Sequence, residues 1–337
     1  MMTSRRALLT GAAATAVAAA LAACSNEVPT NSAATTSPSA QPVLDSERLT
    51  TILARIQKGM DAADAEKSPD ALSGYLTGPA ARVRGEQYTI ATATGDDTRV
   101  HTFTTTPKAG TVGLTTQFPR TALAVTEVAE GDSVEYLLAL TQDSARDDFQ
   151  LWGWARLFAG VVVPATAAPS VGAEQIEADA TGLVATPQEV LDRYVDALNN
   201  PEGDNGKAFA DDLLRQTVAT ARATDFSGMG EATVTATAGT DGFKGLRTAE
   251  GGALVMTTLR YDRVYKNTVA GSTISVDDAA GALMGDNKTV VGTVTASYDV
   301  MIAFSIPPEG SDTNAVALGM DSVIAGVTRD DSQAPTG

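Results

Sequence analysis

Few side chains in this 337-residue chain are of a type that does chemistry. There is one histidine, His101, within a run of threonine and valine that predicts a strand. Imidazole titrates near neutral pH, so an inward-facing His101 with a neighbouring carboxylate could abstract a proton as a general base. A lone histidine on a strand more often has a structural role or lies on the surface. We therefore expect no catalytic residue, and we keep an enzyme with His101 as base as the alternative.

Metal and cofactor sites find little support. One histidine and one cysteine are too few for the usual zinc arrangements. The acidic pairs Asp147–Asp148, Asp211–Asp212 and Asp277–Asp278 lack the spacing of a calcium-binding loop and are typical of solvated turns or helix faces. Calcium held between distant loops stays open at this point. The chain has no Gly-x-Ser-x-Gly elbow, no Ser-x-x-Lys pair and no phosphate-binding loop, so we expect no metal and no cofactor.

Two pairs of aromatic residues are candidates for binding. Trp152 and Trp154 flank Gly153, and residues two apart on a strand project from the same face. Paired indoles could stack on a sugar or anchor a partner, although the surrounding apolar run favours a place in the core. Tyr261 and Tyr265 are four apart on a predicted strand and have the same two interpretations.

The N-terminus has the three parts of a secretory signal. Arg5 and Arg6 are followed by an uncharged, alanine-rich run, Gly11–Ala23, and then by Cys24. This run is shorter than the roughly 20 residues that a membrane-spanning helix needs. Leu21-Ala22-Ala23-Cys24 resembles the lipobox of bacterial lipoproteins. That resemblance implies cleavage between Ala23 and Cys24 and a diacylglyceryl group on the Cys24 thiol, the only cysteine in the chain.

This resemblance implies a location and a mode of attachment. Two acyl chains give a stable membrane anchor where one gives marginal binding, so we expect the chain on the extracytoplasmic face of the membrane. Residues 24–43 are rich in Ser, Thr, Ala, Asn and Pro and predict a flexible tether. Ser4–Leu9 also resembles a twin-arginine signal, without the usual phenylalanine at Leu8, so the export route stays open.

Composition limits the partners and sets the number of domains. The net charge of -17 becomes more negative when Arg5 and Arg6 are removed with residues 1–23, and such a surface repels nucleic acid. With 43% hydrophobic residues, the mature length suits two domains. We expect domains at residues 44–164 and 186–329, a linker at 165–185, which contains Pro and Gly and has no apolar period, and a disordered tail at 330–337.

The two predicted domains have a similar plan. A helix with apolar residues at helical spacing begins near Asp45 or Ser46, and a second begins at a capping box, Thr186–Glu189. The two helices coincide under a shift that places Ile52 on Val190. A second helix is expected at 208–221 and, under the same shift, near Tyr75 in the first half.

Alternating runs after each helix pair predict strands. They cover 87–94, 98–104, 122–127, 134–142 and 150–163 in the first half, and 232–238, 253–266, 290–306 and 315–327 in the second. The fold class is α+β: two similar domains, each with a helix pair on a curved antiparallel sheet. This plan resembles the cystatin-like cone of the nuclear-transport-factor-like superfamily, and the whole chain resembles actinobacterial cell-surface lipoproteins.

The predicted function is non-catalytic binding by a membrane-anchored envelope lipoprotein. The expected partners are the membrane itself, through the anchor, and a small apolar ligand, a wall component or another envelope protein. A structural role in envelope assembly is a further alternative. It predicts an exposed apolar patch and no pocket.

Overall fold

The computed structural model describes residues 39–276 and 278–336. The chain divides into two units, Met1–Ser39 and Ala40–Gly337, and the described helices and strands belong to the second. The predicted signal peptide, Cys24 and the tether up to residue 38 lie outside the described residues. The end of the expected tether belongs to the fold, because Gln41 and Pro42 form a short strand, β1, that pairs with Thr115 and Leu114.

The first half of the second unit places two long helices before four strands. Its elements after β1 are α2 (Ser46–Glu66), η2 (Pro69–Leu72), α3 (Gly78–Thr94), η3 (Asp97–Arg99), β2 (Pro107–Thr115), β3 (Arg120–Thr126), β4 (Tyr136–Gln142) and β5 (Gln150–Leu157). The Asp45 side chain accepts the backbone N–H of Arg48 at 2.8 Å, which caps α2 as predicted. α3 ends at Thr94 and is capped by Gly95, whose φ of +67° favours glycine.

Two predicted strands of the first half are wrong. Residues 87–94 form the end of α3, where Gln87, Tyr88 and Ala91 are buried on one face at helical spacing. The β-branched residues in this stretch misled the prediction, since packing of that face overrides local propensity. Residues 98–104 contain η3 and an irregular segment, so His101 does not lie on a strand.

The second half repeats the order of helices followed by strands. Its elements are β6 (Ala173–Ile176), α4 (Pro187–Asn199), α5 (Asp204–Ala208), α6 (Leu213–Arg222), β7 (Gly230–Ala238), β8 (Lys244–Arg247), β9 (Ala253–Asn267), β10 (Ile274–Ser275), α7 (Asp278–Leu283), β11 (Thr289–Val290), β12 (Thr293–Ile306), β13 (Val316–Asp330) and η4 (Asp331–Gln333). The predicted capping box is confirmed, with reciprocal hydrogen bonds between Thr186 and Glu189.

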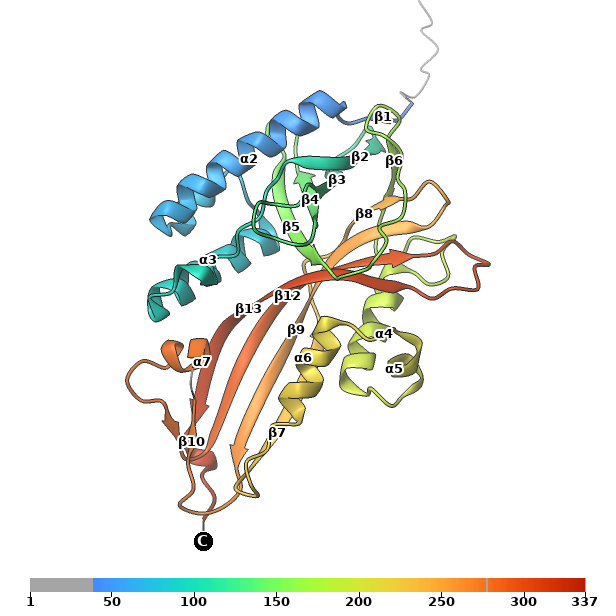
Figure 1. Ribbon diagram of the computed structural model, residues 1–337. Helices are drawn as coiled ribbons and strands as arrows, with labels where there is room; N and C mark the ends of the chain where they lie inside the picture. Colours follow the sequence, from blue (N-terminus) through green and yellow to red (C-terminus); the bar gives the residue numbers. More distant parts are fainter. Residues whose placement is uncertain (1–38, 277, 337) are drawn as a thin grey trace, which may run out of the picture. The chain divides into compact units, whose positions relative to one another are not determined.

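One sheet runs through both halves (Figure 1). Its eleven strands have the order β1-β2-β3-β4-β5-β13-β12-β9-β8-β6, with β7 beside β9. Strand β6 also pairs with β2, so the pairings close into a ring. Two expectations need correction here. Residues 165–185, expected as a linker, contain β6, and the expected disordered tail begins with η4, where Val291 N donates to Asp331.

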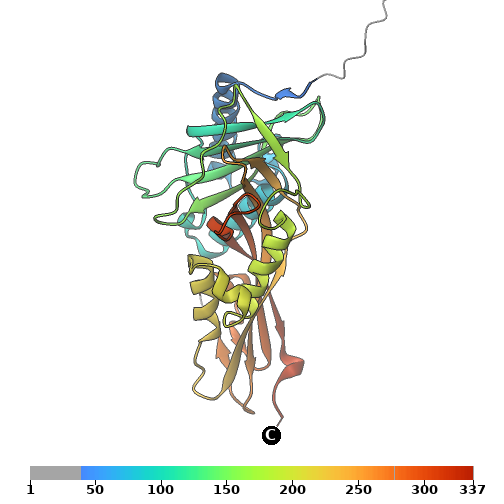
Figure 2. The same cartoon turned by 90° about the vertical axis from the view of Figure 1, so that its right-hand side faces the viewer.

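The buried apolar side chains of the described residues form four clusters, three of them large; the fourth, of Ile274, Val276, Val290 and Val294, lies at β10, β11 and the start of β12. Residues of α2 and α3 pack on the first half of the sheet, and residues of α4 and α6 pack on β9 and β12. A third cluster contains no helical residue: its members come from β3, β4, β5, β6, β8, β9, β12 and β13, so it fills the inside of the ring. The long strands β9, β12 and β13 extend beyond α3 toward α6 and α7 (Figures 1 and 2). The α+β class is confirmed.

Candidate functional site

A cavity of about 400 Å³ lies where helices of both halves meet the long strands. Its walls are the C-terminal part of α3, the segment from η3 to His101, helix α7, and strands β9, β12 and β13. The lining mixes aliphatic residues with polar and charged ones: Gln87, Arg99, His101, Arg263, Tyr265, Ser275, Asp278, Tyr298 and Ser322. The cavity therefore offers both apolar walls and hydrogen-bonding groups, as small-molecule sites do.

The His101 segment is held in place by α3. Arg84, only 1% exposed, donates from Nη1 to the His101 carbonyl at 2.6 Å and to Gln87 Oε1 at 2.9 Å. It also forms an ion pair with Asp64 of α2, whose carboxylate accepts from Arg84 Nε at 2.9 Å. This charge-assisted network fixes an irregular segment that has no ladder hydrogen bonds of its own.

His101 has the carboxylate neighbour that a general base needs. Its Nδ1 lies 2.9 Å from Asp321 Oδ1 on β13, and Trp154 Nε1 donates to Asp321 Oδ2. The Asp321 side chain is 4% exposed, whereas that of His101 is 44% exposed, so the imidazole reaches solvent and its partner does not. The hydrogen bond to Asp321 raises the pKa of His101 above its usual value, against the lowering effect of burial.

Arg263 of β9 is one of the cations in the cavity lining. Its Nη2 donates to Tyr265 Oη at 2.5 Å and its Nη1 to Tyr298 Oη at 3.1 Å. Among the ion pairs of the described residues, none includes Arg263. Arg99, by contrast, pairs with both Asp96 and Asp278.

Two buried hydrogen-bond donors of the cavity-lining residues have no partner. Across the described residues, five buried side-chain atoms lack one, and two of these are Gln87 Nε2 and Arg263 Nε. Gln87 is 1% exposed, so bulk water does not satisfy its amide. A buried donor without a partner costs about 1–3 kcal/mol, and such groups in native proteins call for an explanation.

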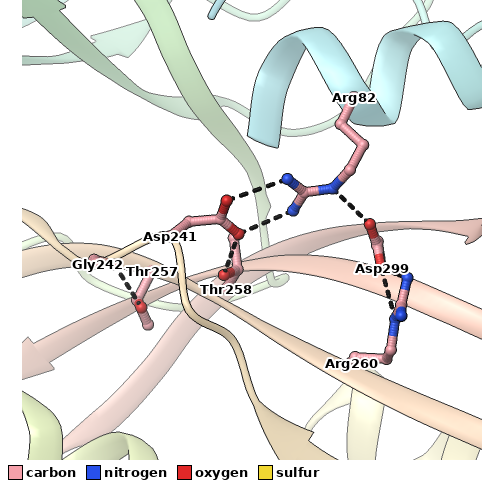
Figure 3. Close-up of polar contacts among 7 residues, drawn as sticks. All are labelled: Arg82, Asp241, Gly242, Thr257, Thr258, Arg260 and Asp299. Atoms are coloured by element: carbon pink, nitrogen blue, oxygen red, sulfur yellow. Dashed lines mark hydrogen bonds and ion pairs between the residues drawn. The ribbon is translucent and has the colours of Figure 1, made fainter. Parts of the chain in front are cut away.

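The wall formed by α3 is fastened to the second half by the polar cluster in Figure 3. Arg82 of α3 donates from Nε to Asp299 Oδ2 at 2.6 Å and from Nη2 to Asp241 Oδ2 at 2.8 Å. Arg260 of β9 donates to the other Asp299 oxygen at 2.9 Å, and Thr258 donates to Asp241 at 2.7 Å. The hydrogen bond from Arg82 lowers the pKa of Asp241. These contacts hold α3 against β9, β12 and the segment before β8.

The two predicted tryptophans do not form a pair. The register of β5 against β4 passes from Ala139 opposite Gly153 to Leu140 opposite Leu151, which leaves Trp152 in a bulge. Trp152 consequently belongs to the cluster inside the ring, and Trp154 to the core beneath α2 and α3. The expectation that they share a face is wrong. Both are buried, at 5% and 0% exposure, and neither lines the cavity.

The two predicted tyrosines have different surroundings. Tyr261 is 2% exposed and stacks on Tyr298 with ring centroids 4.6 Å apart and planes 4° apart. Tyr265 lines the cavity and packs edge-on against Phe226. Sequence reasoning found His101 and Tyr265 but missed Gln87, Arg263 and Asp321. Arg263 stands midway between the two tyrosines on an alternating strand, a signal that could have found it.

A larger cleft, of about 810 Å³, lies between the start of α2, strands β2 to β5 and residues 161–169. Its lining is mainly aliphatic. Its charged lining residues, Lys108 and Glu135, form an ion pair with each other, and its one unpartnered buried atom is the Thr111 hydroxyl. The smaller cavity is the stronger candidate for a binding site. Its lining residues include a cation without an acidic partner, the histidine of the His101–Asp321 pair and two residues with an unpartnered donor.

Comparison with known proteins identifies the family. The model of a family described as a domain of unknown function, DUF8094, matches residues 40–329. The chain belongs to the DUF8094 family. This DUF8094 match covers both halves and the residues that line the cavity. No curated protein and no solved structure matches the chain.

The part of the DUF8094 chain that the structure describes contains neither a membrane-spanning helix nor a cluster of metal-ligating side chains. No helix there is long and apolar enough to cross a membrane. No group of three or more His, Cys, Asp or Glu side chains gathers there as a metal site would require. Cys24, the predicted lipidation site, and Asp277 lie outside the described residues.

Proposed function

We propose that the chain is a lipoprotein, anchored through Cys24 at the extracytoplasmic face of the membrane, that binds a small ligand in the 400 Å³ cavity. The anchor is supported by the signal sequence and lipobox. The binding function is supported above all by Arg263, a cation of the cavity lining whose side-chain hydrogen bonds, among the described residues, go to two neutral hydroxyls.

A bound ligand is energetically more favourable than an empty cavity. A partly buried guanidinium without an acidic partner is unfavourable, and a ligand acceptor oxygen beside Arg263 offsets that cost. The cavity volume falls within the range of roughly 300–1,000 Å³ that small-molecule sites occupy. Aliphatic side chains from Val276, Val294 and Ile324 supply the apolar wall that such sites use for affinity.

The decisive experiment is recovery of the native ligand. The protein is isolated from its own membrane, and small molecules released on denaturation are identified by mass spectrometry. Ser275→Trp fills the mouth of the cavity at an exposed position, whereas Thr50→Trp makes the same change at the larger cleft. We expect the ligand to be lost from Ser275→Trp and retained by Thr50→Trp. The reverse result, or no ligand in the unaltered protein, would exclude this cavity as the binding site.

A second candidate function rests on one observation. His101, with its Nδ1 held by buried Asp321, reaches the cavity as a general base would. If the protein is an enzyme, His101→Gln stops turnover and the molecule recovered from that variant is the substrate, chemically different from the product recovered from the unaltered protein. The same molecule in both preparations favours binding without catalysis.

The finer fold assignment is also a proposal: each half is a diverged copy of one cystatin-like cone. In the first half a helix pair precedes β2-β3-β4-β5, and in the second it precedes β7-β9-β12-β13, each an antiparallel succession of neighbours. The two successions join where β5 pairs with β13.

A wall component and a second envelope protein are the competing partners of the proposed binding function. The mass spectrometry above distinguishes them from a small molecule.

A further inference from the structure

We infer that the ligand has an anionic head, a carboxylate or a phosphate monoester, bound by Arg263, Tyr265 and Tyr298, with its apolar body along α7 and the long strands. This inference rests on the proposed binding function. Its starting point is the guanidinium of Arg263, which is half-buried and bonds to two neutral hydroxyls.

Partial burial of an unpaired cation is unfavourable. Removing a charge from water is unfavourable unless an opposite charge or several hydrogen bonds replace the water. In the described residues no carboxylate lies within 4.0 Å of Arg263. An uncompensated arginine is unexpected in a chain with a net charge of -17, where acidic partners are abundant. An anionic ligand would supply the missing charge.

The neighbouring groups present protons to the cavity. Tyr265 Oη and Tyr298 Oη both accept from Arg263, so each hydroxyl keeps its own proton to donate. Two hydroxyls beside a guanidinium suit a ligand with several acceptor oxygens and no proton to give, which describes a carboxylate or a phosphate.

The other charged groups at the cavity already have opposite partners. Arg99 pairs with Asp96 and Asp278, and His101 lies against Asp321. An anion therefore gains the most electrostatic stabilisation by binding beside Arg263. Around it, Val276, Val294 and Ile324 form apolar surface that suits the hydrocarbon part of an amphiphile.

The test uses the full mature chain with Cys24→Ser, which removes the lipidation site, and calorimetric titration with octanoate, octyl phosphate and octanamide. Octanamide matches octanoate in shape and lacks its charge. We expect the two anions to bind at least tenfold more tightly than octanamide. Equal affinity for octanoate and octanamide would overturn the anionic head but leave small-ligand binding intact.

Variants locate the contact. Arg263→Gln should weaken binding of the anions at least tenfold, while Arg193→Gln, the same charge change on the exposed face of α4, should leave it unchanged. Thermal unfolding checks that both variants are folded. Equal affinity in Arg263→Gln and the unaltered protein would refute the role of Arg263.

Two further outcomes separate this inference from the proposed function. If neither anion binds and the ligand recovered from the native membrane is uncharged, the inference fails and the binding function stands. If no ligand is recovered, the function itself fails.

Asp277 lies in sequence between two cavity-lining residues and outside the described residues, so Asp277→Asn is titrated as well. Its affinity for the anions should be equal or higher, and a loss would contradict the inference.

Discussion

Replacing Asp321 by alanine should destabilise the fold by about 2–4 kcal/mol. The Asp321 carboxylate is 4% exposed. It accepts a hydrogen bond from Trp154 Nε1 and lies 2.9 Å from His101 Nδ1. Trp154 is fully buried, so its N–H is left without an acceptor, at about 1–3 kcal/mol. The lost packing of the carboxylate and the lost contact with half-exposed His101 add about 1 kcal/mol more. That is a large part of the roughly 5–15 kcal/mol by which natural domains are stable.

Asp321→Asn is the matched control. Its amide oxygen still accepts from the Trp154 N–H, so the expected loss is only about 1 kcal/mol. Urea unfolding followed by tryptophan fluorescence measures both variants, because both tryptophans of the chain are buried on β5 and become exposed on unfolding. Equal losses in the two variants, or a loss below about 0.5 kcal/mol for Asp321→Ala, would refute the assignment of Asp321 as the acceptor that buried Trp154 requires.

Three further outcomes are expected. The pKa of His101 is raised by its hydrogen bond to Asp321, so the folded state binds this proton more strongly than the unfolded state. The stability that His101 contributes should thus be complete below its unfolded pKa of about 6.5 and disappear as the pH rises through the folded value. Urea unfolding of the unaltered protein and His101→Gln should accordingly differ more at pH 5.5 than at pH 8.5, by less than about 1 kcal/mol because the side chain is 44% exposed; a larger difference at the higher pH would contradict the sign. Arg82→Met should cost about 1–2 kcal/mol in thermal unfolding, because Asp299 keeps Arg260 while Asp241 loses both bonds from Arg82; no change in stability would show that α3 is held by packing alone. Cys24→Ala should move the protein from the membrane fraction to the supernatant and abolish the mass of the diacylglyceryl group in intact mass spectrometry, and membrane retention of this variant would rule out the lipid anchor.

Local signals predicted a good part of the fold. Side-chain caps at Asp45 and Thr186 place the start of α2 and α4, and these are short-range hydrogen bonds that depend on three or four neighbouring residues. The long strands of the second half follow from alternation within single segments. Prediction failed at residues 87–94, where threonine and isoleucine favour a strand but the helical face is the one that becomes buried.

The candidate site was accessible to sequence reasoning only in part. His101 stood out because it is the single histidine, but its partner Asp321 is 220 residues away along the chain. The shared face of Trp152 and Trp154 was predicted from ideal strand geometry, which one bulged residue reverses. Gln87 carried no signal, since an amide within a helix has significance only when the groups around it are known.

The amino-acid sequence is sufficient for the elements with local causes: the helix caps and the alternation of the long strands. The closed ring of strands, the joining of the halves at β5 and β13, and the cavity depend on contacts between residues far apart in the chain. Side chains such as Gln87, Arg263 and Asp321 have ordinary local surroundings. Their importance comes from burial and from missing or shared partners, and these are properties of the packed chain, which no short stretch of sequence contains.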